Sequence, residues 1–144
     1  MILYLDPSAL VKRYVVEPRS NDVISLIEQA TAVGSSLLAR VEMASALTKA
    51  VRMKWVEADK GEIAWQDFLS DWESFTRLPV SSGLIERAAH LAREYGLRGY
   101  DATHFATVLM WQEFLENPIT LATFDRDLWT VAKKVGMAVW PEEI

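Results

Sequence analysis

The hydrophobic positions of the chain fall into short unbroken apolar runs and longer stretches with helical spacing. Residues 1–5 are apolar at every position, which is typical of a strand buried on both faces in a parallel sheet. Further strands are expected at residues 33–37, 119–123 and 138–140, and an edge strand at 78–80, where a proline cannot donate to a central ladder. Strands that alternate with helices predict an α/β fold with a central parallel sheet of four to five strands.

The segments between these strands have the periodicity of amphipathic helices. We expect helices over residues 9–16, 20–30, 39–54, 58–76, 82–95, 99–115 and 126–135. In the helix at 58–76, the apolar stripe around Phe68 and Trp72 is wider than a single small core needs. A stripe of this width is most often core, and part of it is a candidate protein interface.

Composition narrows the class of protein. The chain has 144 residues, which is the size of one domain, so residues 1–144 are expected to form a single domain. The formal net charge of −5 argues against non-specific coating of nucleic acid, although it allows a local basic rim around an acidic site. The absence of cysteine excludes disulfides and metal–thiolate sites. No segment has the features of a membrane span or a signal peptide, so a cytoplasmic protein without membrane attachment is expected.

Two acidic residues directly follow predicted strands. Asp6 comes after the first strand and precedes Pro7, which suits the first turn of a helix, and Asp125 comes after the strand at 119–123. Taken alone, each aspartate is equally well explained as a helix N-cap. Because the carboxyl ends of parallel strands lie on one edge of a sheet, however, Asp6 and Asp125 are expected to lie near each other.

Two further acids lie in helices that begin near or line the same edge. Glu42 shares its helix face with small and apolar residues, which favours an inward orientation over a solvated one. Asp101 is in a first helical turn, where an acid is also a common partner of the helix dipole. His104 follows on the same helix and is either a metal ligand or, more simply, a core histidine that supports the site.

The four acids together make a stronger case than any one of them. Carboxylates about 5 Å apart, at an effective dielectric of about 20, repel by roughly 3 kcal/mol per pair. Such a cluster either has raised pKa values or binds divalent cations. Oxygen ligands without cysteine favour Mg²⁺ or Mn²⁺, and an ion of this kind is suited to phosphodiester hydrolysis.

Four motifs in this order resemble those of PIN-domain ribonucleases, and most closely the VapC-type toxins of toxin–antitoxin pairs. They are residues 6–12, 38–42, 101–104 and 123–128, and the resemblance extends over nearly the whole chain. It implies a PIN-like α/β/α sandwich and Mg²⁺- or Mn²⁺-dependent endoribonuclease activity. Two small departures, Pro7 and Leu128, concern the shape of the substrate site more than its chemistry.

The resemblance also implies roles for individual residues. The catalytic and metal-binding acids would be Asp6, Glu42, Asp101 and Asp125. Supporting side chains would be Ser8, Thr123 and Asp127. Candidates for contacts with RNA phosphates are Lys12, Arg13, Arg40, Lys49, Arg52 and Arg126.

The expected partners follow from the same resemblance. They are an RNA substrate and a cognate antitoxin protein, which we expect to lie on the aromatic stripe around Phe68 and Trp72 and on the helix that carries Lys49. A homodimer is also expected.

Three other classes of protein place acids at strand ends. An aspartyl-phosphate phosphatase needs a second acid two residues after the first, where this chain has Ser8. A receiver-like signalling domain with an acidic Mg²⁺ site needs a lysine after a late strand, where Thr123 leads only to Phe124 and Asp125. A non-catalytic binding module would tolerate loss of the acids, and activity with and without EDTA distinguishes it.

Overall fold

Strand β1 (Ile2–Leu5) is the centre of the sheet in the computed structural model, which describes all 144 residues. It pairs on one side with β2 (Ala32–Ser36) and on the other with β4 (Ile119–Ala122). The outer strands are β3 (Thr76–Leu78), beside β2, and β5 (Ala138–Trp140), beside β4. All four pairings are parallel and the order is β3-β2-β1-β4-β5, so the predicted parallel sheet is confirmed with five strands.

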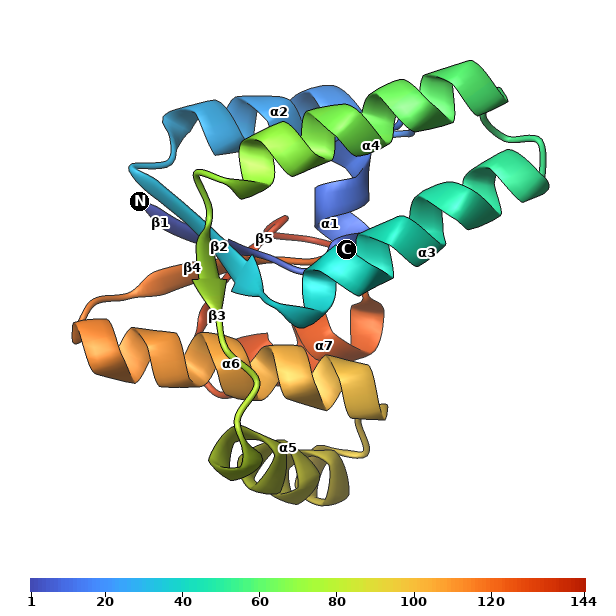
Figure 1. The fold of residues 1–144 in the computed structure, drawn as a ribbon. Coiled ribbons are helices and arrows are strands. Elements are labelled where there is room, and N and C mark those ends of the chain that lie inside the picture. Colours follow the sequence, from blue (N-terminus) through green and yellow to red (C-terminus); the bar gives the residue numbers. More distant parts are fainter.

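Two layers of helices cover the sheet (Figure 1). One face carries α1 (Pro7–Leu10), α2 (Ser20–Gln29), α3 (Leu38–Arg52) and α4 (Ala58–Trp72). The other carries α5 (Ser82–Tyr95), α6 (Gly99–Leu115) and α7 (Arg126–Lys134). No helix combines the length and the apolar character that crossing a membrane requires.

Strand β1 supplies side chains to both cores, because successive strand residues point to opposite faces. Leu3 and Leu5 are fully buried in the core under α1–α4, whereas Tyr4 is fully buried in the core under α5–α7. A strand that is apolar on both faces is what the unbroken run at residues 1–5 predicted.

Most element boundaries agree with the sequence expectation to within one or two residues, and three elements differ more. The helix expected at 9–16 is the short α1 followed by a 3-10 helix at Val11–Arg13. Strand β3 ends at Leu78, before Pro79, instead of covering 78–80, because proline has no N–H to pair with β2. The preceding helix ends at Trp72 instead of residue 76, which leaves residues 73–75 to connect it to β3.

The expectation that a partner lies on Phe68 and Trp72 is wrong for these two side chains. Phe68 is 0% and Trp72 is 2% exposed, and both belong to the core between α4 and the sheet. The stripe is wide because Tyr14 and Phe75 also pack their rings against it. Of the aromatic residues on this helix, only Trp65 is partly exposed.

Candidate active site

Asp6 and Asp125 lie at the carboxyl edge of the sheet. Asp6 directly follows β1, and Asp125 lies shortly after the end of the adjacent strand β4. Each is also a helix N-cap: Asp6 Oδ1 accepts from the Ala9 N–H at 3.1 Å, and Asp125 Oδ1 accepts from the Leu128 N–H at 2.9 Å. The capping explanation and the shared-edge explanation are therefore both correct, because a cap uses only one of the two carboxylate oxygens.

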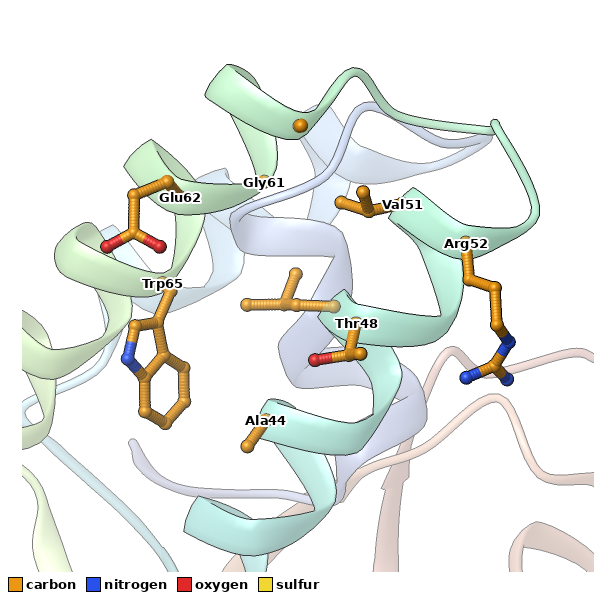
Figure 2. Close-up of a pocket in the computed structure, with 9 residues that line it drawn as sticks. Ala44, Thr48, Val51, Arg52, Gly61, Glu62 and Trp65 are labelled. Atoms are coloured by element: carbon orange, nitrogen blue, oxygen red, sulfur yellow. The ribbon is translucent and has the colours of Figure 1, made fainter.

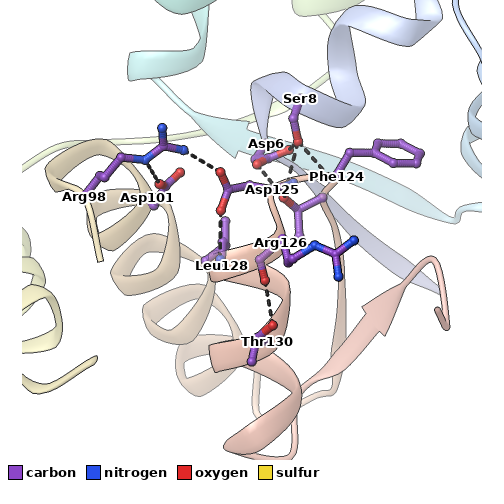
Figure 3. Close-up of polar contacts among 10 residues, drawn as sticks. Asp6, Ser8, Arg98, Asp101, Phe124, Asp125, Arg126, Leu128 and Thr130 are labelled. Atoms are coloured by element: carbon purple, nitrogen blue, oxygen red, sulfur yellow. Dashed lines mark hydrogen bonds and ion pairs between the residues drawn. The ribbon is translucent and has the colours of Figure 1, made fainter. Parts of the chain in front are cut away.

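Asp6 is held by two hydroxyl groups that approach it from different strand ends. The Ser8 hydroxyl donates to Oδ1 at 2.6 Å and the Thr123 hydroxyl donates to Oδ2 at 2.6 Å. These hydroxyls are fixed in turn, since Ser8 Oγ accepts from the Phe124 N–H at 2.8 Å and Thr123 Oγ1 accepts from the Asp125 N–H at 3.0 Å. The Asp6 carboxylate is therefore locked in one orientation (Figure 3).

Asp101 and Asp125 are joined by an arginine that the sequence analysis did not identify. Arg98 Nε donates to Asp101 Oδ2 at 2.9 Å, and a terminal nitrogen of the same guanidinium donates to Asp125 Oδ2 at 2.5 Å (Figure 3). The position of Arg98 three residues before Asp101, at the start of a helix, was the available indication of the first contact. The second contact depends on the tertiary fold.

Glu42 reaches the site from α3 and is held by a histidine of α6. Its Oε1 lies 2.6 Å from Nε2 of His104, and Nδ1 of the same ring lies 2.7 Å from the Tyr4 hydroxyl. Both ring nitrogens are thus engaged, and His104 is only 1% exposed. In this structure His104 supports Glu42 and does not present a free nitrogen to an ion.

Burial raises the pKa of two of these acids, Asp6 and Asp101. Burial raises the pKa of Asp6, and the neighbouring His104 and the hydrogen bonds from Ser8 and Thr123 offset only part of this effect. Burial also raises the pKa of Asp101; Arg98 lowers it, while the charges of Asp125 and Asp6 raise it further. Asp6 and Asp125 are therefore close enough to Asp101 for their charges to raise its pKa.

The acidic side chains are not arranged as a complete coordination site for an ion. No three of the histidine, aspartate and glutamate side chains are grouped so as to hold a metal. The sequence analysis offered raised pKa values or divalent cations as the relief for clustered charge. The structure shows a third route, because Arg98 from the same chain neutralises part of the acidic charge.

The other candidate residues differ in exposure and in whether an acid of the same chain already pairs with them. Arg126 and Asp127 are exposed in the first turn of α7, next to Asp125. Lys12 is tied to Glu17 at 3.0 Å, and Arg13 lies 3.8 Å from Asp71 of α4. The remaining basic candidates are exposed along α3: Arg40, Lys49 and Arg52.

A groove of about 590 Å³ lies between α3 and α4 (Figure 2). The two helices approach closely at their linked ends, where a Cβ on Gly61 would lie 2.4 Å from a Val51 methyl group. Further along, they leave space that is lined on one side by Ala44 and on the other by Trp65. This groove contains the one partly exposed aromatic residue of the predicted interface stripe.

A parallel five-stranded sheet with helices on both faces and acids at its carboxyl edge is the architecture of an α/β protein with an acidic site. A family model of the PIN domain matches residues 3–134, and the chain therefore belongs to the PIN-domain family. Ribonuclease VapC45 of Mycobacterium tuberculosis (strain CDC 1551 / Oshkosh) is 33% identical over 147 residues, which cover 99% of this chain and 97% of that protein.

Solved structures share the fold. FitAB bound to an IR36 DNA fragment superposes with a TM-score of 0.69 and 20% identity, over 97% of this chain and 94% of that one. A toxin–antitoxin complex from Klebsiella pneumoniae superposes with a TM-score of 0.55 and 17% identity, over 82% of this chain and 83% of that one. Together these likenesses agree with the PIN-like α/β/α sandwich that the sequence motifs implied.

Proposed function

We propose that this chain is a divalent-metal-dependent endoribonuclease and the toxin of a toxin–antitoxin pair. The observation that carries the proposal is the convergence of Asp6, Asp101, Asp125 and Glu42 on one edge of the sheet, with raised pKa values for Asp6 and Asp101. The full-length similarity to Ribonuclease VapC45 supports the same activity.

The donor set of the site fits Mg²⁺ or Mn²⁺. The acids supply only carboxylate oxygens, and the chain has no cysteine to favour a softer ion. Asp6, Asp101, Asp125 and Glu42 would hold the ion or ions. A bound ion of this kind lowers the pKa of water and stabilises a leaving oxygen.

The remaining side chains orient the acids and meet the substrate. Ser8 and Thr123 keep the Asp6 carboxylate in one orientation, and His104 does the same for Glu42. Exposed Arg126 lies next to Asp125 and is the basic candidate best placed to contact an RNA phosphate beside the acids. Lys12 and Arg13 are less available, because each is paired with an acid of the same chain.

For the antitoxin we propose the groove between α3 and α4 in place of the buried stripe. The groove is formed by the two helices that the sequence analysis named for the antitoxin: α3, which carries Lys49, and α4, which carries the aromatic residues. Arg52 and Glu62 line it beside apolar side chains, which suits a segment with an apolar face and charges of both signs. The toxin–antitoxin complex among the structural neighbours supports a partner of this kind. A homodimer stays a prediction.

Expression of the chain in a bacterial host tests the toxin function. Induction of the intact chain should arrest growth, Asp6→Asn should abolish the arrest, and co-expression of the small reading frame that adjoins its gene should restore growth. The purified chain should cut single-stranded RNA with Mg²⁺ or Mn²⁺ and not with EDTA. Growth without arrest, or equal arrest by the Asp6 variant, would contradict the proposal.

A further inference from the structure

Arg98 is the one arginine or lysine that forms an ion pair with any of the four candidate acids. It uses Oδ2 of Asp101 and Oδ2 of Asp125, at 2.9 and 2.5 Å. On Asp125 the other oxygen already accepts the capping N–H of Leu128. Arg98 therefore occupies the Asp125 oxygen that accepts no backbone hydrogen bond.

An ion and a guanidinium cannot share these oxygens at low cost. Both groups are cations, so a divalent ion between the two carboxylates would repel the Arg98 charge at contact distance. Asp6 faces no such conflict. Asp6 is held by the neutral hydroxyls of Ser8 and Thr123, which remain compatible with a bound cation.

Arg98 is also free to move. Its side chain is 57% exposed, and only two of the five N–H donors of its guanidinium are used by the acids. Its guanidinium carbon lies 4.8 Å from the centre of the Tyr100 ring, a contact that does not depend on the carboxylates. Departure from the acids therefore requires rotation of an exposed side chain and no change in the core.

We propose that Arg98 is a built-in counter-ion of the Asp101–Asp125 pair that a divalent ion displaces, so that this arginine limits the ion affinity of the site. The inference rests on the proposed metal-dependent function. It assigns Arg98 a regulatory role: the side chain holds the two acids together without an ion and competes with the ion when one arrives.

The test is the affinity for Mn²⁺, measured by isothermal titration calorimetry on the full chain without RNA. Arg98→Gln removes the charge and keeps a side chain of similar polarity, and Arg98→Lys keeps the charge without the planar fork that spans both acids. Arg126→Gln is the matched control, because it removes another exposed charge, which is adjacent to Asp125 in the sequence and pairs with no acid.

We expect Arg98→Gln to bind Mn²⁺ about three- to tenfold more tightly than the unaltered chain, the range that loss of exposed ion pairs supports. Arg98→Lys should fall between the two, and Arg126→Gln should change the affinity less than about twofold. In EDTA, Arg98→Gln should also melt at a lower temperature than the unaltered chain, and saturating Mn²⁺ should narrow that difference.

Unchanged or weaker Mn²⁺ binding by Arg98→Gln would overturn the inference, since it would mean that Arg98 supports the ion-bound arrangement. An equal gain in Arg126→Gln would also overturn it, because the effect would then be one of general charge. Failure of the unaltered chain to bind Mn²⁺ at all would contradict the proposed function itself, so the two failures are distinguishable.

Discussion

Nε2 of His104 lies 2.6 Å from Oε1 of Glu42, and this hydrogen bond joins helix α6 to helix α3 beside the acidic site. A carboxylate only accepts hydrogen bonds, so Nε2 is the donor, and Nδ1 of the same ring pairs with the Tyr4 hydroxyl at 2.7 Å. Glu42 is thereby held by a chain of contacts that begins in the central strand. The position of Glu42 therefore depends on a buried histidine.

The first prediction concerns this histidine. His104→Ala should lower ribonuclease activity and Mn²⁺ affinity by about tenfold, because residues that orient a metal ligand typically contribute between about ten- and a hundredfold. His104→Gln, which retains a donor toward Glu42, should recover part of the loss. His90→Ala, on the exposed face of α5, is the control. Complete loss of Mn²⁺ binding in His104→Ala, equal to that in Asp6→Asn, would show that His104 is itself a ligand.

The second prediction separates activity from stability at Asp6. Asp6→Asn should lower cleavage by at least about a hundredfold, since a catalytic ion supplies several kcal/mol of transition-state stabilisation. In EDTA at neutral pH, the same variant should melt no lower than the unaltered chain, because the raised pKa of Asp6 means that its charged form opposes folding. Glu86→Gln, an exposed acid on α5, should keep full activity.

The pH dependence of that comparison follows from the direction of the pKa shift. The folded chain holds the protons of Asp6 and Asp101 more tightly than the unfolded chain, so these groups favour folding fully at pH values below the ordinary carboxyl pKa of about 4. This contribution is lost as the pH rises through the raised pKa values. The stability of Asp6→Asn relative to the unaltered chain should therefore increase over that range in EDTA, and a relative decrease would contradict the burial of a charged Asp6.

The third prediction concerns metal. Millimolar Mg²⁺ or Mn²⁺ should raise the melting temperature of the unaltered chain, because an ion that binds only the folded state stabilises it by mass action. The same ions should switch on cleavage of single-stranded RNA, and EDTA should reverse both effects. If neither ion changes stability or activity, the acids do not form a metal site.

The sequence predicted the elements whose causes are local. The strand at residues 1–5 is marked by five consecutive apolar residues, and the end of α5 is marked by Gly96, which has the positive φ of 69° that favours glycine. The carboxyl-edge position of Asp6 followed from the strand that precedes it. Strand β3 was placed two residues late, because it is set by its pairing with β2 and ends before Pro79, which has no N–H to continue that pairing.

The parts that were missed depend on contacts between distant residues. Arg98 meets Asp125 across 27 positions and Tyr4 meets His104 across 100, so no local pattern shows either pair. Tyr4 did carry one indication, because a tyrosine in a fully buried strand needs a partner for its hydroxyl. The stripe around Phe68 and Trp72 was expected to be mostly core, and both side chains are buried. The placement of a partner on these two side chains was wrong, since periodicity shows which residues share a face and not how much of that face is covered.

The last prediction concerns the partner groove between α3 and α4. Ala44→Glu places a charge in the apolar part of this groove and should prevent the co-expressed product of the adjoining small reading frame from restoring growth, because a buried unpaired charge is strongly unfavourable. Growth arrest by the variant alone should persist, since the Ala44 side chain takes part in none of the hydrogen bonds or ion pairs of the four acids. Ser70→Glu, on the exposed part of α4 outside the groove, adds the same charge and should leave rescue intact. Copurification of the two chains gives a second measurement that does not depend on toxicity. Full rescue of Ala44→Glu with unchanged copurification would show that the partner binds elsewhere, whereas loss of rescue in both variants would indicate an effect of net charge and not of the groove.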